Sequence, residues 1–260
     1  MLALDVYVSC EKGMVRKQNE DSFVAGRLYK GKEEVGGLEI KGLPMPQLFG
    51  VFDGMGGERG GGEAADLAAR LAAEYGCRFI DGLGNPSFIS EYVHRCHEGI
   101  ASLAEKKRLR RVGAAFAMAL CWKGDLRTFS MGDCRIYLLR GGKLLQLTKD
   151  HSLARKKYEA GLYSWEEMKA SQDRHVLTKY LGMDEASPSS GPEVYSPLSL
   201  REGDRILLCT DGLHHLVREE EMKDALLGEA SLIPYALRKS AYARGGEDNL
   251  TCMVMIVRRG

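Results

Sequence analysis

The amino-acid sequence predicts an α+β fold in which antiparallel β-sheets are covered by helices. Short turns separate a series of strand-length apolar segments in the middle of the chain, which is typical of antiparallel hairpins. Segments whose apolar residues recur at helical spacing come in pairs outside that series. The expected strands are too many for one small sheet, so we expect two sheets.

Two strands and two helices are expected in the first half of the chain. Residues 2–9 alternate partly between apolar and polar side chains, and residues 47–53 form a nearly continuous apolar run that is typical of a strand buried on both faces. Apolar residues then recur at helical spacing over residues 64–79, and this helix should begin near Gly62. A second helix is expected at residues 86–107.

Strands dominate the middle of the chain. Because their links are so short, we expect consecutive strands there to pair as hairpins. A mostly helical insertion should follow at about residues 150–180. The remaining expected strands are residues 113–122, 126–132, 135–140, 143–148, 191–198, 204–210 and 249–259, and the last two expected helices are residues 218–227 and 231–243.

Composition narrows the class of protein. The 260 residues are 44% apolar and 28% charged, as in an ordinary soluble globular domain, and we find no repeat or long linker that would divide residues 1–260. With 37 basic and 36 acidic residues, the chain does not have the basic excess of a general nucleic-acid binder. We expect no membrane span and no signal peptide. The seven scattered cysteines indicate reduced thiols in a cytoplasmic protein.

Carboxylates stand at strand ends or turns in five places. Since one strand of an antiparallel sheet ends beside the start of its neighbour, several of them should share one edge. Gathered carboxylates repel one another unless cations hold them, and oxygen ligands favour Mg²⁺ or Mn²⁺. Any one Asp-Gly pair alone is better explained as an ordinary turn. The prediction of a metal site therefore depends on several acids occurring together at strand ends. The acids are Glu20, Asp21, Asp53, Asp133, Asp211 and Asp248.

The glycine-rich stretch after Asp53, VFDGMGGERGGG, allows three interpretations: a phosphate cradle, a metal site or a flexible turn. A Walker-type phosphate loop would end in Gly-Lys-Ser or Gly-Lys-Thr, and this one does not. We expect the glycines to permit a close approach of the backbone to an ion.

Five segments resemble, in order, the motifs of the metal-dependent Ser/Thr protein phosphatases of type 2C, in their compact bacterial form. They are GMVRKQNEDS, VFDGMGG, SMGDCRIY, LLCTDGL and GGEDNLT, and the resemblance extends from Gly13 to Thr251. It implies a four-layer α/β/β/α sandwich, two antiparallel sheets between helix pairs. It also implies one catalytic domain over residues 1–260, with a flap-like insertion at about residues 150–180 beside the site.

The resemblance also implies roles for individual residues. Asp53 would bridge two Mn²⁺ or Mg²⁺ ions, and Gly54 would offer a backbone carbonyl to one of them. Arg16 would hold the substrate phosphate. The other implied ligands are Asp211 and Asp248 for the first ion, Asp21 and, through water, Glu20 for the second, and Asp133 with Asp211 for a third.

The implied activity is hydrolysis of phosphoserine and phosphothreonine in proteins by a water or hydroxide that bridges the metals, without a covalent phosphoenzyme. The substrates would be products of a Ser/Thr kinase, and the protein a cytoplasmic monomer that binds neither nucleic acid nor membrane. One alternative is a catalytically weak or inactive pseudophosphatase that acts as a binding module. Another is a phosphatase dedicated to one partner of the anti-sigma-antagonist type.

The chain departs from the family pattern in the glycine-rich loop. Met55 and Glu58 stand where many members have a histidine, which leaves the general acid unassigned. Glu58 could relay a proton or order water, although a solvated loop acid is the stronger interpretation.

Several other polar clusters allow a functional and a structural interpretation. For His94 and His97, exposed side chains on a helix are favoured over metal ligands. For His214 and His215, packing or a surface position is favoured over a place at the rear of the site. In the insertion, substrate contact and solvated charge are equally supported for Arg155, Lys156, Lys157 and Arg174. We expect the insertion to be anchored to the body by Tyr158, Leu162, Tyr163, Trp165 and Met168.

Overall fold

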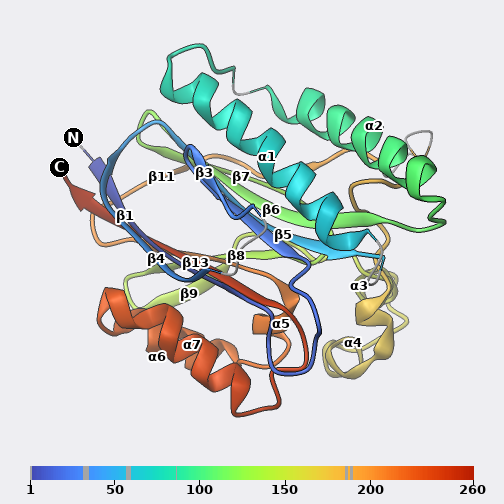
Figure 1. The fold of residues 1–260 in the computed structure, drawn as a ribbon. Coiled ribbons are helices and arrows are strands. Elements are labelled where there is room, and N and C mark those ends of the chain that lie inside the picture. The colour runs from blue at the N-terminus through green and yellow to red at the C-terminus, as the bar shows by residue number, and fades with distance from the viewer. Residues whose placement is uncertain (1, 32–34, 57–59, 86, 185–186, 188–189) are drawn as a thin grey trace.

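A computed structural model describes residues 2–31, 35–56, 60–85, 87–184, 187 and 190–260. Figure 1 shows two stacked β-sheets with one pair of helices above and another below. This four-layer arrangement confirms the predicted fold. The upper helices are α1 (Gly61–Ile80) and α2 (Ile89–Lys107), and the lower ones are α6 (Glu219–Leu227) and α7 (Ile233–Tyr242).

The first sheet has six strands, and all of its neighbours pair antiparallel. Its two central strands, β12 (Arg205–Cys209) and β13 (Leu250–Arg259), pair antiparallel. The residues that follow β12 therefore lie beside the residues that precede β13. In spatial order the strands are β4 (Val35–Pro44), β1 (Leu2–Glu11), β13 (Leu250–Arg259), β12 (Arg205–Cys209), β8 (Arg135–Arg140) and β9 (Lys143–Gln146).

The second sheet is also antiparallel. Its order is β10 (Glu193–Val194), β7 (Asp125–Met131), β6 (Gly113–Trp122), β5 (Gln47–Met55), β2 (Asp21–Ala25) and β3 (Leu28–Tyr29), and β11 (Leu198–Ser199) also pairs with β7.

Alternating apolar residues build three core layers because successive strand side chains point to opposite faces. On β12, Ile206 and Leu208 face the other sheet, whereas Leu207 packs under α6 and α7. The alanine-rich face of α1 packs on the second sheet, where Ala64 and Ala68 are fully buried. Both sheets are therefore covered on both faces, as their nearly continuous apolar strands predicted.

The chain differs from the sequence prediction in two respects. The strands β2, β3 and β4 were not expected, because short or glycine-interrupted segments carry a weak strand pattern. The link from β7 to β8 is not a hairpin, since β7 belongs to the second sheet and β8 to the first. Short length alone does not show whether a turn pairs two strands or passes from one sheet to the other.

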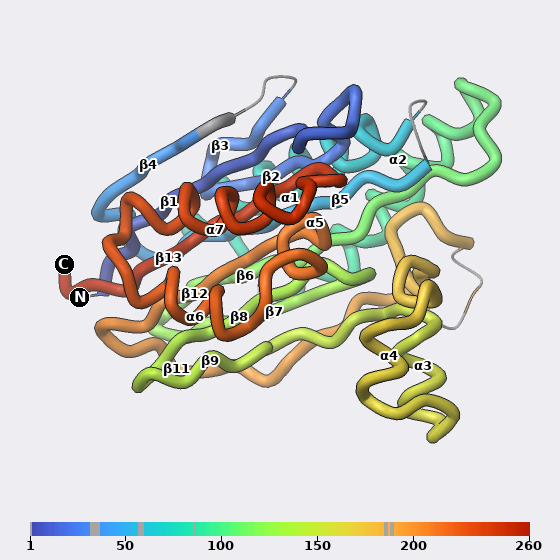
Figure 2. Tube along the Cα trace, turned by 90° about the horizontal axis from the view of Figure 1, so that it is seen from below, coloured from blue at the N-terminus to red at the C-terminus, as the bar shows by residue number. Residues whose placement is uncertain are grey.

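The predicted helical insertion is present at one end of the sandwich. It contains α3 (Leu153–Glu159), α4 (Trp165–Ala170) and the 3₁₀ turn η1 (Gln172–His175), and we call residues 150–180 the flap segment. Figure 2 shows α3 and α4 projecting together beyond the sheets. Two short elements complete the chain, α5 (Asp211–His214) and η2 (Ala230–Leu232). Among the described helices, none combines the length and apolar composition needed to cross a membrane.

Candidate active site

A cleft of about 250 Å³ opens where the ends of both sheets meet the flap segment. It brings together residues from all five sequence motifs. Of the predicted site residues, those that line it are Arg16, Glu20, Asp53, Gly54, Asp133, Asp211 and Asp248. The remaining predicted residue, Asp21, lies buried behind Asp53, its register partner on the neighbouring strand.

The second sheet holds Asp21 and Asp53 side by side. Both Thr210 and Thr251 donate hydroxyl hydrogen bonds of 2.8 Å to Oδ2 of Asp21. Among the described residues, its other oxygen, Oδ1, is buried without a hydrogen-bond partner. A buried carboxylate oxygen without a donor is costly, and a cation would satisfy it.

The first sheet supplies the opposite wall. Asp211 is the first residue of α5, directly after Thr210 at the end of β12, and Asp248 precedes β13. These two strands are neighbours, so the two acids share one edge, as expected. Asp53 lies in the other sheet, however, and within β5 rather than at its end. The carboxylates therefore converge from two sheets and not along one.

Asp133 reaches the cleft from the link that crosses between the sheets. Gly132 in this link has a φ of +99°, and an added Cβ would lie 2.3 Å from Cβ of Ala115. The link is held by the start of the flap segment, because the His151 amide donates to the Gly132 carbonyl at 2.8 Å.

Burial and mutual repulsion perturb this cluster strongly. Burial raises the pKa of Asp21 to about 7. Burial, followed by the charge of Asp211, raises the pKa values of Asp53 and Asp133 well above their usual range. For Asp211 burial acts upward, but the hydrogen bond with His215, the neighbouring histidines and a hydrogen bond with Asp53 together outweigh it and lower its pKa. Such a cluster stores repulsion that a bound cation relieves.

The glycine after Asp53 is required by packing. A Cβ on Gly54 would lie 2.3 Å from the carbonyl oxygen of Gly61 and 2.6 Å from that of Glu20. The first turn of α1 thus rests on the strand that carries Asp53. This contact, rather than closeness to an ion, explains the glycine in the structure.

Arg16 sits at the mouth of the cleft and forms an ion pair of 2.7 Å with Asp248. Its loop is fastened by Asn249, whose amide donates at 2.8 Å to the carbonyls of Lys12 and Gln18. Oδ1 of Asn249 accepts from the Glu20 amide at 2.8 Å. Sequence reasoning missed this anchor, although Asn249 follows Asp248 within a quoted motif.

The residues of the cleft fit a pair of hard divalent cations. The atoms available as metal ligands are carboxylate and backbone carbonyl oxygens, which suit Mg²⁺ and Mn²⁺. Among the described residues, the buried oxygen of Asp21 without a partner and the raised pKa values of Asp53 and Asp133 both indicate a place for positive charge.

Comparison with known proteins agrees with this geometry. A family model described as Protein phosphatase 2C matches residues 41–239, more than half of the chain. The chain belongs to this phosphatase family. It is therefore a serine/threonine protein phosphatase, as the motifs predicted.

Relatives match the phosphatase over nearly its whole length. It is 29% identical over 256 residues to the serine/threonine phosphatase stp of Listeria welshimeri, covering 96% of this chain and 93% of that protein. It is 30% identical over 260 residues to the serine/threonine protein phosphatase PstP of Mycobacterium tuberculosis, covering 97% of this chain and 45% of PstP. A structure of the PstP catalytic domain in complex with two manganese ions superposes with a TM-score of 0.80 at 27% identity, with both chains covered completely.

Two histidines lie beside the cleft of the phosphatase, and the packed position that the sequence favoured holds for His214. The buried His214 donates from Nε2 to the Asp133 carbonyl at 2.9 Å. Burial and then Arg135 lower the His214 pKa well below its usual range, so the ring is neutral. Nδ1 of His215 lies 3.3 Å from Oδ2 of Asp211. Their position directly after the Asp211-Gly212 motif was the available signal.

The second histidine pair is not a metal site. His94 is exposed on α2, whereas His97 is buried and its Nδ1 accepts from the Gly182 amide at 3.0 Å. The exposed-face interpretation thus holds for His94 and is wrong for His97. In the glycine-rich loop, Met55 lines the cleft, and Glu58 lies outside the described residues.

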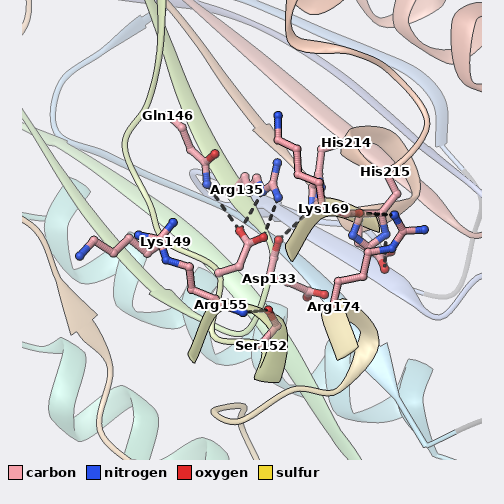
Figure 3. Close-up of polar contacts among 12 residues, drawn as sticks. Asp133, Arg135, Gln146, Lys149, Ser152, Arg155, Lys169, Arg174, His214 and His215 are labelled. Carbon is pink, nitrogen blue, oxygen red and sulfur yellow. Dashed lines mark hydrogen bonds and ion pairs between the residues drawn. The ribbon is translucent and has the colours of Figure 1, made fainter. Parts of the chain in front are cut away.

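Of the four basic residues considered for substrate contact, two are paired within the flap segment of the phosphatase. Lys157 contacts Asp173 at 2.6 Å, and Arg155 contacts Glu159 at 2.9 Å. Arg155 and Arg174 both line a second cavity of about 320 Å³ next to the cleft. Figure 3 shows Arg174 beside His215, with Arg135 nearby.

The expected anchors of the flap segment are partly wrong. Leu162 and Trp165 are exposed, and Trp165 stacks edge-to-face on Tyr158 within the flap segment. The attachment to the body instead uses backbone hydrogen bonds: the His151 amide donates to the Gly132 carbonyl, and directly after the flap segment Leu181 forms an antiparallel bridge with Ala114.

Proposed function

We propose that the carboxylate cleft is where this phosphatase hydrolyses phosphoserine and phosphothreonine in proteins. The observation that carries the proposal is the meeting of acids from both sheets with one arginine in a single cleft. Two divalent cations, Mn²⁺ or Mg²⁺, would be held there, in line with the two manganese ions of the PstP structure.

The ligand roles follow the predicted set. Asp53 would bridge both ions, since it pairs in register with Asp21 and its pKa is raised by burial and then by the charge of Asp211 in the other wall. The first ion would also take Asp211, Asp248 and the carbonyl of Gly54. The second would take Asp21 and, through water, Glu20. Asp133 and Asp211 would hold a third ion.

When bound, the two cations supply a nucleophilic water near neutral pH and neutralise charge on the phosphoryl oxygens. The residues of the chain position these parts. The Thr210 and Thr251 hydroxyls fix the Asp21 carboxylate, and Asn249 holds the loop that carries Arg16. The planar guanidinium of Arg16 would bind two phosphoryl oxygens. No side-chain nucleophile is needed, which agrees with a cleft made of acids.

The test is hydrolysis of p-nitrophenyl phosphate and of phosphoserine and phosphothreonine peptides, with Mn²⁺ and with chelator. We expect turnover that requires the metal and falls by at least about a hundredfold in Asp53→Ala. Arg16→Ala should raise KM more than it lowers kcat. A folded protein that binds Mn²⁺ but hydrolyses no phosphopeptide would instead support the binding-module alternative, which the intact acid set does not favour.

We further propose that residues 1–260 form one catalytic domain, that its substrates are products of a Ser/Thr kinase, and that it acts as a cytoplasmic monomer. The seven free cysteines, six of them buried, support a reducing compartment. Light scattering after size-exclusion chromatography and fractionation of cells test the last two points.

A further inference from the structure

Two histidines and one carboxylate meet at the edge of the cleft. His175 ends the turn η1 in the flap segment, Asp211 begins α5, and His215 directly follows α5. One potential ligand atom from each of the three residues lies within 4.8 Å of those of the other two. The rings of His175 and His215 are edge-to-face, with centroids 5.0 Å apart.

We propose that His175, Asp211 and His215 form a transition-metal site of the Zn²⁺ class, which joins the flap segment to α5. This ligand set shares only Asp211 with the carboxylate centre. Two imidazole nitrogens and one carboxylate oxygen suit Zn²⁺ and similar ions, whereas Mg²⁺ and Mn²⁺ prefer the all-oxygen set deeper in the cleft. A fourth position would remain open to water.

The geometry requires only a small contraction. Bonds of about 2.0–2.2 Å in a tetrahedral zinc site place ligand atoms roughly 3.4 Å apart. The ligand atoms now lie within 4.8 Å of one another, so each pair has to approach by roughly 1.4 Å at most. His175 is exposed, so its ring can turn toward Asp211 without disturbing the core.

The surroundings allow this movement. Nε2 of His175 accepts a hydrogen bond of 3.0 Å from Nε of Arg174, so this neutral ring has a lone pair to offer. If the ring turns away, Arg174 keeps its other contact, a 3.0 Å hydrogen bond to the Lys169 carbonyl.

The consequence for the enzyme follows from where the ligands lie. A metal held by His175 and His215 would fix the flap segment against the body. It would also engage Asp211, which the proposed function assigns to the catalytic ions. If the proposed function holds, Zn²⁺ at this site should inhibit Mn²⁺-supported hydrolysis, and His175→Ala should relieve the inhibition.

Zinc binding is the direct test, and it needs no substrate. Competition with a chromophoric chelator, in saturating Mg²⁺, should report one tight Zn²⁺ equivalent in the wild type. His175→Ala and His215→Gln should each weaken it by at least about tenfold, the lower limit even for residues that only support a ligand. His94→Ala is the matched control, because His94 is an exposed histidine on α2, and it should bind as the wild type does. Asp53→Ala should retain the site, and circular dichroism checks that each variant is folded.

A second readout follows the flap segment itself. Zn²⁺ should slow tryptic cleavage at the exposed Lys156 and Lys169 in the wild type and have no such effect in His175→Ala. The proposal fails if neither histidine variant changes zinc binding, or if Asp53→Ala abolishes it. It also fails if His215→Gln weakens only Mn²⁺ binding while His175→Ala changes nothing, because His215 would then merely orient Asp211. These outcomes are independent of phosphatase activity and so separate this proposal from the proposed function.

Discussion

Asn249 shows how one side chain can hold an active site together. Its amide group bonds to three backbone groups of the loop over residues 12–20, which carries Arg16 and Glu20. The Met14 amide of this loop also donates to the Gly246 carbonyl at 2.8 Å, and Arg16 itself is exposed. Asn249 therefore helps to set the position of the arginine relative to the acids.

We expect Asn249→Ala to lower the free energy of unfolding by about 2–3 kcal/mol, because the three hydrogen bonds of a buried side chain are lost. It should also reduce kcat/KM by at least about tenfold, since misplaced groups lose catalytic alignment. Urea unfolding and steady-state kinetics measure the two effects. In the control Asn85→Ala, one exposed hydrogen bond to Ser87 is lost, and both quantities should stay near the wild-type values. Equal effects in the two variants would contradict the anchoring role.

At the level of elements, the link between β7 and β8 places Asp133. The chain leaves one sheet after Met131 and enters the other at Arg135. Its sharp passage depends on Gly132, which has a positive φ and touches Ala115.

Gly132→Ala should lower the free energy of unfolding by about 2–4 kcal/mol, because it adds backbone strain and a Cβ contact of 2.3 Å with Ala115. The control is Gly142→Ala in the true hairpin between β8 and β9. Gly142 also has a positive φ, +71°, but an added Cβ would meet no atom within 4 Å, so only about 1 kcal/mol should be lost. Chemical denaturation of both variants distinguishes steric crowding from φ strain, and similar losses would rule out the crowding.

The start of the flap segment is fixed by a paired charge. Arg135 binds Asp150 through two hydrogen bonds of 2.8 and 2.6 Å, and both side chains are largely buried. Asp150→Asn should lower the free energy of unfolding by about 2–3 kcal/mol, because Arg135 is left without its counter-charge. In the exposed pair of Arg27 and Asp81, Asp81→Asn should change the free energy of unfolding far less, because solvent screens this pair. Thermal unfolding compares them, and an equally small loss in Asp150→Asn would show that this pair does not anchor the flap segment.

At the scale of the whole molecule, the sandwich explains why the site is acidic in a chain with a formal net charge of only +1. Two sheets meet with their ends aligned, so acids separated by up to about 230 positions reach one cleft. The buried apolar faces fix the register of each strand, and a slip by one residue would turn Asp21 or Asp53 out of the site.

The sequence was sufficient for the fold class, most helices and the membership of the acids in one site. These features follow from local periodicity and from motifs that are continuous along the chain. The sequence was insufficient for β2 to β4, for the crossing after Gly132 and for the roles of Asn249 and His215. Each of those depends on partners far away in the chain, and no local pattern records such a contact.

The crowded carboxylates also predict how stability depends on pH. The pKa of Asp21 is raised to about 7 by burial, from about 3.9 in an unfolded chain. Between these values the folded state holds a proton that the unfolded state lacks, so this contribution is fully present below about pH 4 and is lost as the pH rises through about 7. Buried histidines act with the opposite sign below about pH 6.5, but they are shared by any variant at position 21.

The comparison of Asp21→Asn with the wild type therefore isolates the carboxylate. In chelator, we expect the free energy of unfolding of the variant, relative to the wild type, to increase by about 1–3 kcal/mol from pH 5 to pH 8, because only the wild type must ionise a buried acid at position 21. Added Mn²⁺ should stabilise the wild type most at the high-pH end, where the ionised Asp21 can bind it, and should stabilise the variant less. Urea unfolding at a series of pH values measures both. A relative stability that falls with rising pH in chelator would contradict the raised pKa of Asp21, and with it the view that a cation completes this site.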